Sequence, residues 1–328
     1  MADDTPISWT HRAGTRGRTW NPTDGCQVCS PGCANCFAMR FAGRFSKPGL
    51  RYHGLVTIAK NKRAIWTGEG RLDIGKLAKP LSWKQPSTIF VNSMSDLFYE
   101  EFSNEQIAAV FGVMAACPQH VFQILTKRAR RMREWFAWVD RESRHRGSWT
   151  TPHWSIIEDA ARDELVAGGS RWGKRFPATA AGRSWPLSNV WLGTSTENQE
   201  TFDERVEYLL ACPAAIYFLS VEPLLGPIDA SHALRRMLRT HDGRLLRNDH
   251  PDARSTGGVW RRHVDQVIVG AESGPGARPC DDAWLRSLRD QCRAAGVAFF
   301  VKQLVVDGRL RKDKREFPAD LRIQEFPQ

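Results

Sequence analysis

Short, almost continuously apolar runs alternate with longer amphipathic segments along much of this chain. The apolar runs occupy residues 88–96, 121–128, 190–198, 215–224, 266–274 and 297–303. Each run predicts a β-strand that is buried on both faces, because a strand with one solvated face would alternate polar and apolar residues. The amphipathic segments, which predict helices, occupy residues 104–117, 197–212 and 281–296.

Capping residues mark the ends of the predicted helices. Asn104, Asn198 and Asp281 are the expected N-caps, and Gly296 is an expected C-cap directly before the last strand. Strands that alternate with helices at this spacing predict parallel βα units. A further strand near the N-terminus brings the number of strands to about seven, which predicts a (β/α) TIM-like barrel, complete or partial. We expect a single α/β domain over residues 1–328.

A polar cluster ends each of the apolar runs. In chain order the clusters read NSMSD, TKR, TSTEN, SVEP, GAESG and KQ. In a parallel barrel the carboxyl ends of the strands lie on one face, and active sites are found there. The clusters are therefore expected to converge on one site, and ordinary loop polarity is the alternative explanation.

Two arginine-rich segments, residues 140–187 and 229–263, interrupt the alternation of strands and helices. We interpret both as insertions on the barrel scaffold. The first segment also contains several tryptophans. Basic side chains interleaved with aromatic ones can bind phosphates and stack on bases, which indicates a nucleic-acid interface. Solvated helices with tryptophan packed beneath them are the alternative.

The composition is that of a soluble globular protein, with 41% hydrophobic and 25% charged residues. No apolar run reaches the roughly eighteen residues that a membrane span needs, and the N-terminal residues do not form a secretory signal. We therefore expect a protein of a reducing cytosol, with no membrane contact. The formal net charge of +11 indicates a polyanionic partner such as nucleic acid, or only the arginine bias of a high-GC genome.

Four of the eight cysteines, Cys26, Cys29, Cys33 and Cys36, lie close together near the N-terminus. In a reducing compartment such a cluster indicates metal or redox chemistry. Three thiolates from one loop can hold an iron–sulfur cubane and leave one iron open. The spacings C-x3-C-x2-C (from Cys29) and C-x6-C-x2-C (from Cys26) both allow this. A zinc site of all four is less favoured, because few residues separate the two pairs, and unmetallated thiols are a third alternative. Free cysteine often packs as a small apolar residue, which we expect of Cys117, Cys212, Cys280 and Cys292.

Seven short motifs follow one another from about residue 19 to residue 303. They read TWNPTDGCQVCSPGCANCFA, NSMSDLF, FQILTKRARRM, NVWLGTSTENQ, FLSVEPLLGPID, VIVGAESGPGARP and FFVKQ. Together they resemble a phage-associated family of uncharacterised proteins that carry a three-cysteine motif. That family is itself similar to the radical S-adenosylmethionine (SAM) superfamily. The two arginine-rich segments fall outside these motifs.

The resemblance implies that Cys26, Cys33 and Cys36 bind a [4Fe–4S] cluster, because the family motif has cysteine at these positions. Cys29 stands at a position that is not usually cysteine, and Phe37 at one that is usually tyrosine. Cys29 therefore creates a second triplet with the spacing that is usual in the superfamily. It remains the alternative to Cys26 as the first ligand.

The resemblance also implies that polar groups at the strand ends bind SAM. Asn92, Ser93 and Asp96 are the expected contacts of the methionine amine. The expected contacts of the ribose and carboxylate are Ser195, Glu197, Glu222, Glu272 and Ser273. Charge-assisted hydrogen bonds to the SAM carboxylate or to a substrate phosphate are expected from Lys127, Arg128 and Lys302. Salt bridges to arginine are the alternative role of each carboxylate.

The function that the resemblance implies is that of a radical SAM enzyme of phage origin in the cytoplasm of a bacterial host. It would reductively cleave SAM to a 5′-deoxyadenosyl radical, with electrons from a separate donor. The radical would modify or repair a base of a nucleic acid or a nucleotide. A non-catalytic nucleic-acid-binding protein with a structural zinc or iron–sulfur site is the main alternative. A peptide or a small metabolite as substrate is a third hypothesis.

Overall fold

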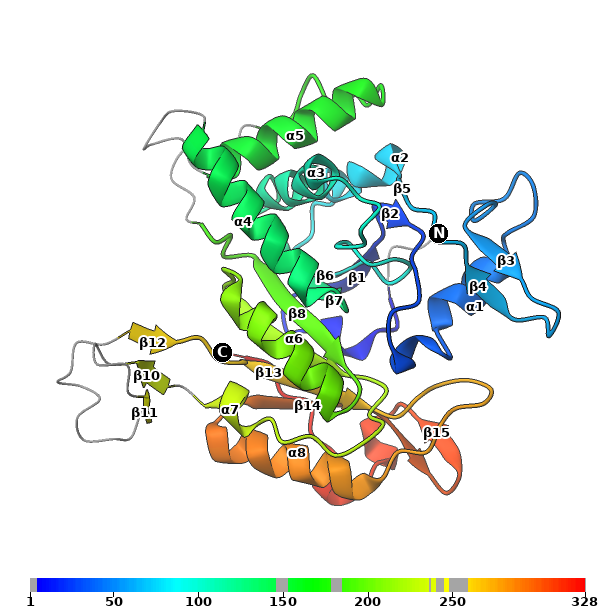
Figure 1. Ribbon diagram of the computed structural model, residues 1–328, viewed down its shortest axis with the longest axis vertical. Coiled ribbons are helices and arrows are strands. Elements are labelled where there is room, and N and C mark those ends of the chain that lie inside the picture. The colour runs from blue at the N-terminus through cyan, green and yellow to red at the C-terminus, as the bar shows by residue number, and fades with distance from the viewer. Residues whose placement is uncertain are drawn as a thin grey trace.

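The fold is described from a computed structural model that covers residues 5–145, 153–177, 185–235, 237–239, 245–247 and 259–327. Its main feature is a curved sheet of eight strands (Figure 1). In order across the sheet these are β1 (Arg16–Trp20), β6 (Ser87–Val91), β7 (Val121–Thr126), β8 (Val190–Thr196), β9 (Ile216–Val221), β13 (Gln266–Gly270), β14 (Ala298–Val306) and β15 (Arg309–Arg311).

The strands from β1 to β14 pair in parallel, and only β15 is antiparallel to its neighbour. Across the described residues the strand order begins at β1 and ends at β15, so the curved sheet stays open. The prediction of an α/β fold is therefore confirmed. Of the two predicted forms, complete and partial, the sheet has the form of a partial barrel.

Helices connect the parallel strands and lie outside the curved sheet (Figure 1). They are α3 (Asn104–Ala115), α4 (Ala129–His145), α5 (His153–Ala167), α6 (Gln199–Ala211), α7 (Ser231–Leu234) and α8 (Asp282–Ala295). The predicted caps Asn198, Asp281 and Gly296 are confirmed, and Gly296 has the left-handed conformation that favours glycine. The predicted cap Asn104 is wrong by one position. Ser103 caps α3, because its extended backbone lets the hydroxyl accept from the Gln106 amide, while the Gln106 side chain accepts from the Ser103 amide.

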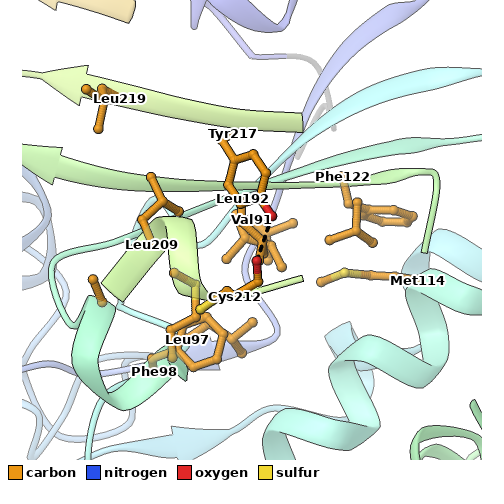
Figure 2. Close-up of a cluster of buried hydrophobic side chains, with 14 of the residues drawn as sticks. Val91, Leu97, Phe98, Met114, Phe122, Leu192, Leu209, Cys212, Tyr217 and Leu219 are labelled. Carbon is orange, nitrogen blue, oxygen red and sulfur yellow. Dashed lines mark hydrogen bonds between the residues drawn. The ribbon is translucent and has the colours of Figure 1, made fainter. Parts of the chain in front are cut away.

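A large apolar core fills the space between the sheet and these helices. Figure 2 shows part of it, in which Phe122 of β7 and Leu192 of β8 face Met114 of α3. All three side chains are almost completely buried, and burial of each contributes about 2 kcal/mol to stability. The Tyr217 hydroxyl also lies in this core and donates a hydrogen bond of 2.6 Å to the Cys212 carbonyl, so its polar atom is satisfied.

A second apolar cluster fills the concave side of the sheet. Its buried members are Trp9, Phe90, Trp191, Phe218, Ile268 and Phe300. Gly193 on β8 makes room for this cluster, since a Cβ atom there would lie 2.4 Å from the Phe218 ring. The interior of the half-barrel is thus a packed core.

The residues between β1 and β6 form a smaller layer beside the sheet. Its elements are β2 (Thr23–Asp24), α1 (Phe37–Gly43), β3 (Val56–Ile58), β4 (Ala64–Trp66), β5 (Arg71–Leu72) and α2 (Ile74–Leu77). β3 and β4 form a hairpin that lies next to α1 (Figure 1). Buried Met39, Tyr52 and Trp66 join this layer to Met94 beyond β6. Short 3₁₀ turns in this layer span Pro31–Cys33 and Lys79–Ser82, and others in the described chain span Ser8–Thr10, Lys314–Glu316 and Ala319–Leu321.

The first predicted insertion, residues 140–187, contains α5, which packs closely against α3. A Cβ atom on Gly112 of α3 would lie 2.0 Å from the Ile157 carbonyl oxygen. The second, residues 229–263, contains α7 and a small antiparallel sheet of β10 (Met237–Arg239), β11 (Leu245–Arg247) and β12 (Val259–Arg261). Residues 146–152 and 178–184 of the first segment and residues 236, 240–244 and 248–258 of the second lie outside the described residues, and with them part of the predicted nucleic-acid interface. None of the described helices has the length and apolar character needed to cross a membrane.

Candidate functional site

A cavity of about 310 Å³ opens between the carboxyl ends of the parallel strands and the cysteine loop, residues 25–36. The strands from β6 to β13 each contribute residues at or just beyond their C-terminal ends. β14 contributes Lys302 and Gln303 from its middle, so the predicted polar cluster KQ lies within this strand and not at its end. The predicted site residues that line the cavity are Cys26, Cys33, Cys36, Asn92, Ser93, Asp96, Lys127, Arg128, Ser195, Glu222, Glu272, Ser273 and Lys302. Cys29 and Glu197 do not line it. The structure therefore brings the polar ends of the predicted strands together on one face.

Local backbone geometry shapes the cysteine loop. Gly25 has a φ of 95°, a conformation that glycine adopts without strain. Pro31 follows Ser30, the N-cap of the 3₁₀ turn that ends at Cys33. Gly32 in this turn packs directly on a carboxylate, because a Cβ atom there would lie 2.2 Å from Glu197 Oε1. The sequence SPGC thus forms a tight turn that only a residue without a side chain allows at its centre.

Side chains from distant strands hold the cysteine loop in place. Ser30 Oγ donates a hydrogen bond of 2.8 Å to Glu197, which follows β8. Arg128, which follows β7, donates to the Gln27 carbonyl at 3.0 Å. The loop conformation therefore depends on residues at the end of the barrel strands.

The four thiols of the loop differ in their surroundings. Cys26, Cys33 and Cys36 are partly buried, whereas Cys29 is exposed. A hydrogen bond with Cys29, aided by the charge of Lys127, lowers the pKa of Cys33 to about 5. Burial raises the pKa of Cys26 to about 12 and also raises the pKa of Cys36. In the described part of the chain, no three or more Cys, His, Asp or Glu side chains are arranged to hold a metal ion.

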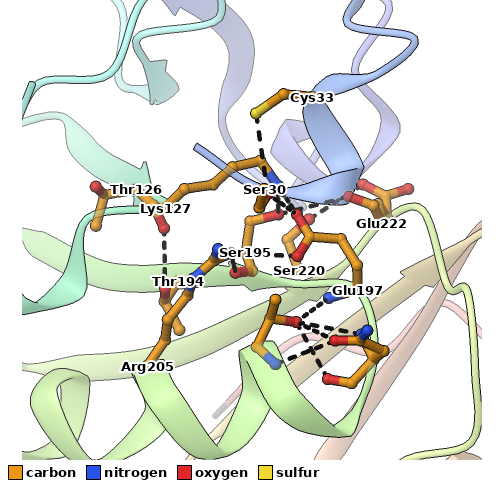
Figure 3. Close-up of polar contacts among 12 residues, drawn as sticks. Ser30, Cys33, Thr126, Lys127, Thr194, Ser195, Glu197, Arg205, Ser220 and Glu222 are labelled. Carbon is orange, nitrogen blue, oxygen red and sulfur yellow. Dashed lines mark hydrogen bonds and ion pairs between the residues drawn. The ribbon is translucent and has the colours of Figure 1, made fainter. Parts of the chain in front are cut away.

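Glu197 is the centre of a buried ion network behind the cavity (Figure 3). Its side chain is completely buried and forms ion pairs with Lys127 and with Arg205, whose Nη1 lies 3.3 Å from Glu197 Oε2. Burial alone would raise the pKa of this carboxyl, but Lys127 and Arg205 together lower it. Lys127 also donates to Ser195 Oγ at 2.9 Å. Both oxygens of Glu197 are occupied, so its contacts are those of a residue that positions Ser30 and Lys127.

Asp96 is likewise fully engaged by the protein. Its Oδ1 accepts from the Thr126 hydroxyl at 2.7 Å and from the Phe98 amide at 3.0 Å. Its Oδ2 accepts from the Lys127 amide at 2.9 Å and lies 3.3 Å from Arg128 Nη1. These bonds join the end of β6 to the end of β7. They also orient Arg128, whose Nη1 lies 3.7 Å from Cys26 Sγ.

Two acceptor atoms at the cavity have no partner among the described residues. Asn92 has a left-handed φ of 60°, which is uncommon for a residue with a side chain. Its Nδ2 donates a hydrogen bond of 2.8 Å to the Thr23 hydroxyl, while its Oδ1 is buried and has no partner among the described residues. Glu222 holds Lys302 at 3.0 Å and the Ser220 hydroxyl at 3.2 Å with Oε2, and its buried Oε1 is unpaired. Buried acceptors of this kind cost free energy unless a ligand or water donates to them. Because Asn92 and Glu222 both line the cavity, a polar ligand bound there would lie close to these two oxygens.

Glu272, beyond β13, accepts hydrogen bonds from both sides of the cavity mouth. Arg278 donates to it through its backbone amide at 2.8 Å and through its guanidinium. Asn35 of the cysteine loop donates to it at 2.9 Å. Burial raises the pKa of this carboxyl, but the bonds from Arg278 and Asn35 outweigh burial and lower it to about 2. Glu272 therefore anchors the end of the cysteine loop to the loop that follows β13.

A family model described as "Protein of unknown function (DUF5131)" matches residues 4–319. The chain belongs to this family. The matched range includes the cysteine loop and every strand end that lines the cavity. Comparisons with curated proteins and with solved structures find no match. The DUF5131 match therefore covers almost the whole chain but states no function, so the chemistry has to be inferred from the site.

The cavity of this DUF5131 member contains three thiols from one loop. They belong to Cys26, Cys33 and Cys36. Iron–sulfur clusters are held by thiolates of this kind, often from one loop. The unpaired acceptors of Asn92 and Glu222 in the same cavity suit an additional polar ligand. The donor set thus fits a cysteine-bound cluster with a ligand beside it.

Two residues that hold the site together were not among the sequence predictions. Arg205 donates to the Ser195 carbonyl at 2.7 Å and is 3% exposed. Its sequence signal is its helical spacing from Phe202 and Leu209, which places an arginine on the buried face of α6. Asn35 lies within the cysteine loop, and nothing in its local sequence indicates its bond to Glu272.

Proposed function

We propose that this protein is a radical SAM-type iron–sulfur enzyme. The observation that carries the proposal is the single cavity lined by Cys26, Cys33 and Cys36 and by the polar ends of the barrel strands. A [4Fe–4S] cluster bound there would supply the electron that cleaves SAM to methionine and a 5′-deoxyadenosyl radical. A separate electron donor would reduce the cluster.

Cys26, Cys33 and Cys36 would hold the cluster through their thiolates. Cys33 has the lowered pKa that favours this form. Arg128 lies beside Cys26 Sγ and would stabilise negative charge on that sulfur. Cys29 is exposed and does not line the cavity. We propose that Cys29 neighbours the ligands without binding the cluster. Alanine variants of Cys26 and Cys29 distinguish the two ligand sets.

Asn92 and Glu222 would accept hydrogen bonds from the amine or the ribose hydroxyls of SAM. Each has one buried oxygen at the cavity without a partner among the described residues. Lys302, held 3.0 Å from Glu222, would meet a carboxylate through a charge-assisted bond. Ser93, Ser195 and Ser273 also line the cavity, and their hydroxyl groups would lie close enough to form hydrogen bonds with the same ligand.

The packed half-barrel would keep water away from the reacting groups. Phe90 and Leu125 line the cavity, and Phe90 belongs to the apolar cluster on the concave side of the sheet. A reactive carbon radical needs such an environment, because exposure to solvent and stray side chains allows side reactions.

A base of a nucleic acid or a nucleotide is the substrate that we propose. The net charge of +11 supports a polyanionic partner. A base inside a duplex could not reach an enclosed site, so the base would be single-stranded or flipped out. The resemblance to phage-associated proteins supports a phage origin and action in a bacterial cytoplasm.

The test is anaerobic reconstitution of the protein with iron and sulfide, followed by reduction and addition of SAM. We expect a [4Fe–4S] signal in electron paramagnetic resonance that changes when SAM is added, and formation of 5′-deoxyadenosine. Cys36→Ala should abolish both, and Cys280→Ala, a matched change at a partly buried thiol away from the cavity, should abolish neither. Tightly bound stoichiometric zinc without SAM cleavage would overturn the proposal in favour of a structural metal site.

A further inference from the structure

A second cavity of about 590 Å³ lies beside the first, on the other side of the cysteine loop. Asn35 and Cys36 line both cavities. The other walls come from α1, from the β3–β4 hairpin and from the loop at residues 275–276. In Figure 1 this region is the layer of α1, β3 and β4 that projects beside the sheet. It forms a groove that leads along α1 to the cysteine loop.

Among the residues that the structure describes, the charged ones that line the groove are all cations, and no carboxylate lines it. Arg40, Arg44, Lys62 and Arg63 are its charged lining residues. Arg40 donates to the Ser273 carbonyl at 3.3 Å, and Arg63 donates to a carbonyl in the cysteine loop. Within the described part of the chain none of the four forms an ion pair, so their charges are left uncompensated. Four uncompensated cations in one groove create a positive potential that attracts a polyanion.

An exposed aromatic ring stands where the groove meets the first cavity. Phe37 lines that first cavity, yet its side chain is 59% exposed. It stacks on Phe41, with ring centroids 5.9 Å apart and an interplanar angle of 30°. Phe41 in turn packs against the buried cluster that includes Tyr52. One face of a rigidly supported ring is therefore free for a flat partner.

We propose that the groove binds the sugar–phosphate backbone of a single-stranded nucleic acid while Phe37 stacks against a base at the mouth of the first cavity. Cations that follow a backbone and aromatic rings that stack on bases are the two recurring features of single-strand binding sites. An acidic peptide would use the cations and not the ring, and a paired duplex would not expose a base face to Phe37. This inference rests on the proposed function, because the bound nucleic-acid strand would be the substrate that reacts in the first cavity.

The experiment measures binding of a fluorescently labelled oligothymidine to the full-length protein by anisotropy over a range of salt concentrations, without SAM. Phe37→Leu should weaken binding about tenfold, because removal of one stacked base typically costs this much. Phe37→Trp should retain binding. Arg44→Gln with Lys62→Gln should reduce the slope of log K against log salt by about 1.4, at about 0.7 for each phosphate that is no longer neutralised.

The matched control is Lys84→Gln with Arg293→Gln, which removes two exposed cations at the N-terminal end of the strands and should leave the slope unchanged. The inference would be overturned if the oligonucleotide did not bind, or if both double variants had equal slopes. It would also be overturned if polyglutamate, an acidic polypeptide, displaced the oligonucleotide and Phe37→Leu had no effect on binding. SAM cleavage without oligonucleotide binding overturns this inference alone. Binding with the expected variant effects but without SAM cleavage supports it and overturns the proposed function.

Discussion

Ser30 and Glu197 are joined by a hydrogen bond of 2.8 Å although 167 residues separate them in the chain. Glu197 is completely buried and is kept ionised by Lys127 and Arg205. An isolated buried carboxylate would be costly, so the two cations are a condition for this arrangement. One carboxylate thus couples the cysteine loop to β8 and α6, and the site is only as stable as this network.

Glu197→Gln should destabilise the protein strongly. The substitution keeps the shape of the side chain but leaves Lys127 and Arg205 without their counterion, and we expect the free energy of unfolding to fall by about 3 kcal/mol. Denaturant titration measures the change. Glu204→Gln on α6 is the matched control, because that side chain is 67% exposed and lies 3.7 Å from Arg205. It should cost less than about 1 kcal/mol, and equal losses in the two variants would contradict the expectation.

Gly32→Ala should displace the cysteine loop while the fold persists. The added Cβ atom would lie 2.2 Å from Glu197 Oε1, and that carboxylate cannot retreat because two cations hold it. We expect little iron and sulfide after reconstitution and a folded protein by circular dichroism. Gly226→Ala is the control, since its added Cβ atom would lie 3.7 Å from Asn198 Cβ, an ordinary van der Waals distance. Full iron content in Gly32→Ala would show that the loop tolerates the shift.

Most strands of the half-barrel could be predicted because each of them is an almost unbroken apolar run. Five of the six predicted runs extend past their strands at the C-terminal end, as in residues 266–274, where β13 ends at Gly270. Those extra residues are the polar ones that line the cavity. The last run, residues 297–303, instead stops before β14 ends at Val306. The sequence could not distinguish a complete barrel from a partial one. Closure depends on whether the first and last strands pair, and the local pattern of apolar residues does not predict such pairing.

The candidate site was predictable where chemistry is clustered in the sequence and not where it depends on packing. The cluster of four cysteines is recognisable from spacing alone, whereas the preference for Cys26 over Cys29 as the first ligand comes from the family resemblance. Arg205 reaches Glu197 only because α6 packs with that face inward, and Asn35 meets Glu272 across 237 residues. The basic groove beside α1 arises in the same way, since Arg40 and Lys62 come together only when the β3–β4 hairpin lies next to the helix.

The four cysteine-to-alanine variants of the loop should separate into two groups. Cys26→Ala, Cys33→Ala and Cys36→Ala should each lose the cluster, because these thiols line the cavity. Cys29→Ala should retain it, because that thiol is exposed and does not line the cavity. Iron and sulfide content with the visible absorption spectrum measures each variant. A cluster in Cys26→Ala together with its loss in Cys29→Ala would assign the first ligand to Cys29.

Glu222→Gln should weaken SAM binding with little effect on stability. The amide oxygen would stay with Lys302 and Ser220, which places the NH₂ group where the unpaired Oε1 now lies. A donor would then replace an acceptor, and we expect the dissociation constant of SAM to rise about tenfold, as for loss of one hydrogen bond to a charged group. Equilibrium titration of the reconstituted protein measures it. The exposed Glu101 provides the matched variant Glu101→Gln, and equal affinities of the two variants would exclude this role for Glu222.

Acid should weaken the anchor between Glu272 and Arg278. The pKa of Glu272 is lowered from its ordinary value of 4.5 to about 2, because hydrogen bonds from Arg278 and Asn35 outweigh the effect of burial. A carboxyl whose pKa is lower in the folded state contributes stability above its unfolded pKa and loses it as the pH falls through its folded pKa. We therefore expect wild type to be more stable than Glu272→Gln at neutral pH, with a difference that shrinks between about pH 4.5 and pH 2. Denaturant titrations of both proteins over this range measure the difference. As a control, the stability difference caused by Glu272→Gln should be smaller and less dependent on pH when Arg278→Met is also present. If the stability difference in the protein with Arg278 did not change with pH, the charge of Glu272 would add nothing to the anchor.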